Sequence, residues 1–225
     1  MKKKLFLLFF SIVIIYGGNL PASAQTYSLA ISPQSFTIDG QSFSGYSTTF
    51  VQPFEVINKE WWRYVKSRTV IFNKKTHLEL TVPAQGKEAN EPLKFVSQLY
   101  EGKKHKQTVL RMALITDGVA TDQVADLKKQ AQYLMKDFKV NYFTEVVQEK
   151  ILEKESDAKD ISMEMDKYLL ENSKIKTRME KKPEEKNTLS QTLRSNTNKI
   201  EKLQSQLQAN QKQLAQLKKE LTLIK

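Results

Sequence analysis

Cysteine is absent from this chain of 225 residues, and histidine occurs only twice. The chain therefore has no disulfide, no thiol nucleophile and no cysteine to which an exported protein attaches a lipid anchor. Neither His77 nor His105 has a second metal-binding side chain at ligand spacing, so the sequence predicts no metal site. An exported protein without disulfides depends on a hydrophobic core or on contacts between subunits.

Catalytic and cofactor-binding motifs are also missing. The sequence contains no Gly-x-Ser-x-Gly, no phosphate-binding loop and no dinucleotide fingerprint. Residues 117–122 resemble a calcium loop but lack its alternating acidic ligands, so we interpret them as a turn with a helix cap at Thr121 or Asp122. We therefore expect no enzyme activity and no cofactor, with a hydrolase only as a distant alternative.

Long apolar runs are absent except at the N-terminus. Three lysines at positions 2–4 precede the apolar run Leu5–Tyr16, and Ala22–Ala24 offers a small-residue cleavage site. This pattern is typical of a secretory signal peptide, and the run is shorter than the roughly 20 residues of a membrane-spanning helix. We expect residues 1–24 to be removed near Ala24 and the mature chain to be periplasmic or extracellular, without a transmembrane span. An uncleaved N-terminal anchor is the alternative.

Positive charge exceeds negative charge, but unevenly. The formal net charge is +11, and it falls to +8 when the three lysines of residues 2–4 are set aside. Residues 118–185 hold 13 basic and 15 acidic side chains, whereas residues 186–225 hold 8 and 2. Opposite signs on neighbouring segments favour their pairing and weaken the case for a polyanion-binding protein. We expect no nucleic-acid partner.

The last forty residues carry a heptad repeat. Apolar residues recur with alternating spacings of four and three, interrupted by Asn196 and Asn210, which is typical of a coiled coil. The apolar members are Leu189, Leu193, Ile200, Leu203, Leu207, Leu214, Leu217, Leu221 and Ile224.

A second seam with the same spacing precedes the first. Its apolar members include Val147, Ile151, Ile161, Met165, Ile175 and Met179. Pro183 interrupts the helical pattern, and proline with following glutamates is favoured at the start of a new helix. We therefore predict a coiled-coil hairpin over residues 147–225 with its turn near 181–187. One long kinked helix that pairs between subunits is the alternative.

The residues before the seams read as a small α+β head. Alternating apolar residues predict strands from 27–31 onward, an Asp39–Gly40 hairpin turn and a mainly antiparallel sheet over residues 25–117. Ile57, Trp61, Tyr64 and Val65 share one face of a helix that we expect to lie on this sheet. Residues 118–146 then form a helix that packs on the head and enters the stalk.

Three further features of the sequence each have a structural or a functional interpretation. The basic hairpin tip with Lys103, Lys104 and Lys106 is either an anionic-surface contact or a solvated turn that protects a sheet edge. Trp62 either marks a binding groove or covers a sheet edge. Met163, Met165 and Met179 are interpreted as stalk packing, with adaptable binding of a client protein as the alternative.

With head and stalk placed, the mature chain resembles exported proteins of Bacteroidetes-like bacteria that combine a small α+β head with a C-terminal coiled coil. The residues that carry the resemblance are Glu60–Lys66 (EWWRYVK) and Tyr133–Phe138 (YLMKDF). The resemblance implies an envelope or extracellular location and transfers no activity and no functional residue.

The sequence thus favours a non-catalytic envelope protein whose coiled coil mediates protein contacts or self-association, with peripheral contact to anionic envelope components as an addition. Two alternatives stay open. One is a periplasmic holdase chaperone, although no strand follows the final helix to rejoin the body. The other is a head that binds a small apolar ligand or an envelope polymer, with the helices as a spacer.

Overall fold

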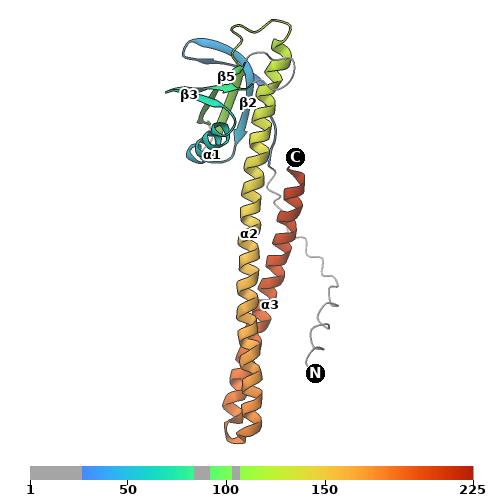
Figure 1. Ribbon diagram of the computed structural model, residues 1–225. Helices are drawn as coiled ribbons and strands as arrows, with labels where there is room; N and C mark the ends of the chain where they lie inside the picture. Colours follow the sequence, from blue (N-terminus) through green and yellow to red (C-terminus); the bar gives the residue numbers. More distant parts are fainter. Residues whose placement is uncertain (1–26, 84–91, 103–106, 225) are drawn as a thin grey trace.

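A computed structural model describes residues 27–83, 92–102 and 107–224. It consists of a sheet with a short helix, both at one end of a long helical hairpin (Figure 1). The elements are β1 (Ser32–Ile38), β2 (Gln41–Phe50), α1 (Phe54–Lys66), β3 (Val70–Lys74), β4 (His77–Val82), β5 (Leu93–Glu101), β6 (Thr108–Leu114), α2 (Val124–Lys181), the 3-10 turn η1 (Pro183–Glu185) and α3 (Lys186–Leu223).

The six strands form one antiparallel sheet in the order β1-β2-β6-β5-β4-β3. The β1–β2 turn uses Asp39 and Gly40, whose φ angles of 50° and 82° are those of the tight hairpin turn that Asp-Gly favours. The predicted α+β class, with a mainly antiparallel sheet and a helical hairpin after it, is confirmed.

One face of the sheet carries the main core. Helix α1 lies on it with the predicted face inward, because Ile57, Trp61, Tyr64 and Val65 are all buried. The first turns of α2 pack on the same core through an aromatic cluster that centres on Phe138. The head is therefore closed by the beginning of the same helix that forms the stalk.

The other face holds a smaller core where the β1–β2 hairpin approaches the neighbouring strands. Phe36 and Ile38 pack there against Val96 and Ala113. A Cβ on Gly45 would lie 2.2 Å from the Met112 carbonyl oxygen. At this position β2 therefore lies too close to β6 for any residue other than glycine.

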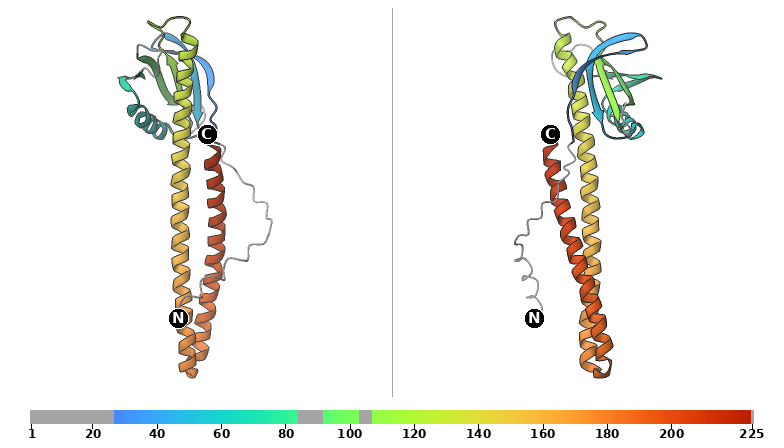
Figure 2. Two further views of the ribbon diagram at one scale, coloured as in Figure 1. Left: turned by 45° about the vertical axis from the view of Figure 1, so that its right-hand side comes forward. Right: turned by 180° about the vertical axis from the view of Figure 1, so that it is seen from behind.

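Helix α2 continues without interruption for 58 residues, and α3 folds back along it for 38 residues (Figures 1 and 2). At the standard rise these helices are about 87 Å and about 57 Å long. The chain reverses at Lys182, followed by Pro183 at the start of η1, as the proline break predicts.

Two local predictions were wrong. Residues 27–31 form no strand, because side chains rather than a neighbouring strand satisfy the Ala30 carbonyl: Thr48 Oγ1 donates to it at 2.7 Å. Neither Thr121 nor Asp122 caps α2. The helix begins at Val124 after Gln123, with no capping hydrogen bond from a side chain.

Candidate functional site

The interface between α2 and α3 is the most extensive feature of the hairpin. Among the predicted seam residues, Val147, Ile151, Ile175, Ile200, Leu203 and Ile224 are buried, and Ile161, Met165, Met179, Leu189, Leu193, Leu207, Leu214, Leu217 and Leu221 are half-buried. The two apolar stripes face each other within one chain, as the antiparallel hairpin requires.

Polar contacts across the seam fix its register. Lys218 Nζ lies 2.9 Å from Glu155 Oε1 near the head. Lys199 Nζ lies 4.8 Å from the centre of the Tyr168 ring, and Arg178 pairs with Glu185 at the turn. Such exposed pairs contribute little stability, but together they define which turns of the two helices are level.

Asparagines interrupt the apolar seam. Asn196 and Asn210 are only 3% and 7% exposed, and each has a side-chain polar atom without a hydrogen-bond partner, as does Asn172. Tyr168 on α2 is level with Lys199 on α3. One turn closer to the tip, Asn172 of α2 is therefore level with Asn196 of α3. Buried polar residues in a seam lower stability and specify pairing.

The open end of the hairpin joins the core of the head. Ile224 is 7% exposed and belongs to the same buried cluster as Phe143 and Val147, and the last leucines of α3 pack beside it. Tyr27 also lies here, with its ring centre 5.1 Å from that of Phe143. Head and stalk therefore share one continuous core.

The outward face of α2 is not covered. Leu152, Met163 and Leu170 are 65%, 57% and 58% exposed, and helical geometry places them within about 20° of one another around the axis. The interpretation of Met163 as stalk packing was wrong, because this residue lies two positions from the seam residue Met165 and so faces the opposite side. At the standard rise Leu152 and Met163 are about 16 Å apart and Met163 and Leu170 about 10 Å apart, so they form an aligned row of separate side chains rather than one continuous apolar patch.

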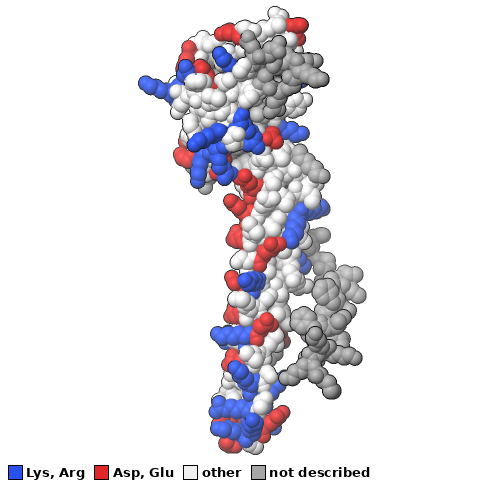
Figure 3. All heavy atoms as spheres, in the orientation of Figure 1, with Lys and Arg blue, Asp and Glu red and all other residues white. Residues whose placement is uncertain are grey.

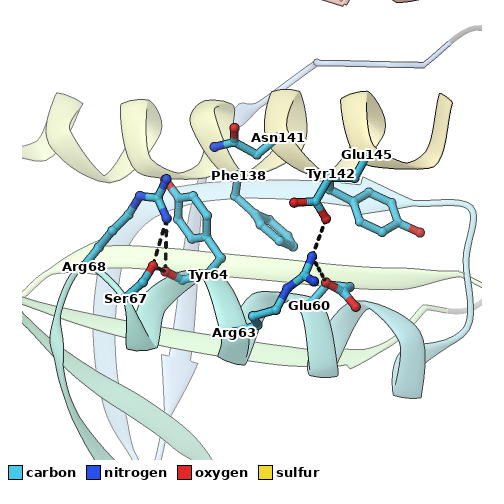
Figure 4. Close-up of a pocket in the computed structure, with 9 residues that line it drawn as sticks. All are labelled: Glu60, Arg63, Tyr64, Ser67, Arg68, Phe138, Asn141, Tyr142 and Glu145. Atoms are coloured by element: carbon cyan, nitrogen blue, oxygen red, sulfur yellow. Dashed lines mark hydrogen bonds and ion pairs between the residues drawn. The ribbon is translucent and has the colours of Figure 1, made fainter. Parts of the chain in front are cut away.

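A groove of about 260 Å³ lies between α1 and α2 (Figure 4). Arg63 on α1 bridges Glu60 and Glu145, the latter on α2. Tyr64 donates a hydrogen bond to Asp137 Oδ2 at 2.7 Å, and Asn141 donates to the same oxygen at 3.0 Å. The charged groups of the groove are thus paired with each other across the two helices.

Burial keeps the phenols of this groove protonated. The pKa of Tyr64 is raised by burial and by the contact with Asp137. Burial, with smaller contributions from nearby carboxylates, raises the pKa of Tyr142 to about 12. Neutral phenols held between helices bind and orient but do not act as bases at neutral pH, so the groove is best described as a clamp that fixes α1 on α2.

A lysine that the sequence did not single out is buried beside the sheet. Lys139 is 0% exposed, and burial lowers its pKa to about 8. Its amine donates to Thr48 Oγ1 at 2.5 Å and to the Ala30 and Thr49 carbonyl oxygens at 3.4 and 3.3 Å. No carboxylate of the described residues pairs with it. A lysine on an amphipathic helix gives no sequence signal of burial.

A second cavity of about 420 Å³ lies over these oxygen acceptors. Its lining is rich in hydroxyl and amide groups from residues 28–34 and 47–49. The cavity is shallow and holds no charged side chain in its lining, so it lacks a group that would anchor a charged ligand.

The remaining candidate residues do not converge. His77 lies 3.4 Å from Asp39 and 3.8 Å from Glu79, and no group of three or more metal-binding side chains is found in the described ranges. Trp62 is 39% exposed, next to the fully buried Trp61. Lys103, Lys104, Lys106 and His105 lie outside the described residues.

Comparisons place no known protein beside this chain: no family model, curated protein or solved structure matches it. Within the parts of the chain that the structure describes, no helix has the length and apolar character needed to cross a membrane.

Proposed function

We propose that this protein is a non-catalytic exported envelope protein whose helical hairpin contacts another protein or a second copy of itself. The observation that carries the proposal is the row formed by Leu152, Met163 and Leu170 on the outward face of α2. A partner that lies along α2 would bury all three side chains at once, and this burial of apolar surface favours association.

The closed seam supports this assignment of the contact surface. Because α3 covers the inner stripe of α2, a partner meets the outward face rather than the seam. The shared core of head and stalk also supports it, because Ile224 at the end of α3 and Phe143 on α2 belong to one buried cluster with residues of the sheet, which ties the hairpin to the head.

The test replaces the three outward residues together. Leu152→Gln, Met163→Gln and Leu170→Gln should abolish cross-linking through the stalk in envelope preparations and any concentration-dependent rise in mass by light scattering. The matched control carries Val51→Gln, Tyr133→Gln and Leu223→Gln, which are also exposed apolar positions, and should behave as wild type. Unchanged cross-links in the outward-face variant would contradict the proposal.

A holdase chaperone is a second candidate, favoured by the same exposed side chains, because adaptable apolar surfaces bind unfolded clients. The two functions separate in an aggregation assay with an unfolded outer-membrane protein. Stoichiometric suppression of aggregation that depends on Leu152, Met163 and Leu170 would favour the chaperone. If aggregation is not suppressed, contact with a specific protein partner is the function that stands.

A further inference from the structure

Charge is distributed unevenly along the hairpin. Its distal end, residues 172–200, holds eight basic and three acidic side chains, a net charge of +5. The part nearer the head has the opposite sign: residues 145–171 hold four basic and nine acidic side chains, and residues 201–224 hold four and two, a combined −3. Figure 3 shows basic side chains gathered at the far end of the stalk and acidic ones along its side.

Most of the distal charge is available for contact. Arg178 and Lys182 pair with Glu185. Six other exposed basic residues have no carboxylate within 4.0 Å in the described part of the chain, and one of them, Lys199, lies over the Tyr168 ring. The other five are Lys174, Lys176, Lys181, Lys186 and Arg194.

The shape of this end decides what kind of partner it fits. Lys174 and Lys181 are two turns apart on the outward face of α2, Lys176 points to another side, and Lys186 belongs to α3. Neither of the two cavities described above lies here. A discrete anion needs converging donors in a concave site, whereas diverging lysines on a narrow convex end match an extended, flat array of negative charge.

We propose that the distal end of the hairpin docks end-on on an anionic lipid surface. The Debye length of about 8–10 Å limits the attraction to groups close to the headgroups. An upright hairpin therefore presents mainly the charges nearest the turn, where residues 175–192 hold five basic and three acidic side chains, a net charge of +2, and it keeps the acidic part away. Lying flat would bring the nine carboxylates of residues 145–171 into the same layer. From Tyr142 to Lys181 the helix rises about 58 Å, which sets the distance between the surface and the head.

Docking on lipid goes beyond the proposed function and rests on it only for the envelope location, where anionic lipid is present. Binding to vesicles does not depend on the outward apolar row, so failure of one proposal leaves the other intact. The two also respond to different changes, one to salt and lysine replacement, the other to removal of apolar side chains.

The experiment measures binding of residues 25–225 to vesicles of phosphatidylcholine with about 30 mol% phosphatidylglycerol, against vesicles of phosphatidylcholine alone. Wild type should bind only the anionic vesicles and should dissociate at high salt. Lys174→Gln, Lys181→Gln and Lys186→Gln together should weaken binding about 100-fold, because each lysine near the surface contributes about 1 kcal/mol.

A matched variant removes the same charge elsewhere. Lys159→Gln, Lys202→Gln and Lys212→Gln are exposed positions of the part nearer the head, and this variant should bind within about threefold of wild type. A third variant changes Lys103, Lys104 and Lys106 to Gln. Helical circular dichroism and melting confirm that each variant is folded. No binding by wild type, equal losses in the first two variants, or loss confined to the third would overturn the proposal.

The absence of cysteine allows a direct test of orientation. A single environment-sensitive dye at Asn187→Cys, beside the turn, should shift its emission when anionic vesicles are added. The same dye at Ser35→Cys, on an exposed strand position of the head, should not. A shift at the head position, alone or equal to that at the turn, would show a different contact and reject the end-on arrangement.

Discussion

Trp61 and Trp62 are sequence neighbours with opposite environments. Trp61 is fully buried, and its indole nitrogen donates to Ser97 Oγ at 3.0 Å, which joins α1 to β5. Trp62 is 39% exposed. Consecutive helical residues point about 100° apart, so one lies in the core stripe and the other on its flank.

Replacement of the two tryptophans should therefore have unequal effects. Trp61→Ala should lower the free energy of unfolding by about 3–5 kcal/mol, because it empties a core site and leaves Ser97 without its donor. Trp62→Ala should cost less than about 1 kcal/mol. Urea denaturation measures both, and acrylamide should quench mainly Trp62. Equal costs would contradict the packing described for α1.

Lys139 makes stability depend on pH. Its pKa is about 8 in the folded protein, against 10.5 for a lysine in water, so the unfolded chain binds more protons between these values. The free energy of unfolding therefore rises with pH across this window, by roughly 3 kcal/mol in total from this group.

The variant Lys139→Met tests this sign. The stability of wild type relative to the variant should be greater at about pH 10 than at about pH 7, because only wild type loses a buried charge on deprotonation. Urea denaturation at the two pH values gives the difference. Lys136→Met, an exposed position on the same helix, controls for loss of a charge. A relative stability that does not change with pH would contradict the burial of the Lys139 amine without a compensating charge.

Among the helices, the buried asparagines of the α2–α3 seam lower stability and specify how the two helices pair. Asn172 and Asn196 are level in the seam and each keeps an unpaired polar atom. Replacement of both by Leu should raise the free energy of unfolding by about 1–3 kcal/mol, since two desolvated amides give way to apolar contact.

The matched control for this pair is Lys174→Leu with Asn198→Leu, exposed positions on the same two helices, which should change stability by less than about 0.5 kcal/mol. Thermal and urea denaturation give the comparison. A destabilised Asn172→Leu, Asn196→Leu variant would mean that the two amides are bonded to each other in solution and that the seam depends on them.

At the scale of the whole molecule, the hairpin fixes the overall dimension. A stalk built on the 58-residue α2 should give a maximum dimension on the order of 100 Å in solution scattering. If α3 instead continued past the turn in line with α2, the two helices would reach about 145 Å. Scattering from residues 25–225, with the mass measured on the same sample, separates the two, and a dimension near the larger value would reject the hairpin.

Local spacing and backbone preference were enough to predict the periodic parts of this protein. Ile57, Trp61, Tyr64 and Val65 define one helical face, Asp39–Gly40 defines a turn, and Pro183 defines where the stalk reverses, because each depends only on local spacing or backbone preference. Two matched heptad stripes likewise predict a coiled coil.

Which distant segments pack together became known only from the folded structure. Residues 27–31 alternate like a strand but find no strand beside them, and Lys139 is buried only because oxygens from distant segments gather around its amine. The inclusion of Ile224 in the buried cluster that continues into the head, and the separation of a basic tip from an acidic shaft, follow from α3 folding back. Contacts between residues far apart in the chain depend on packing, and the local spacing of residue types does not predict them.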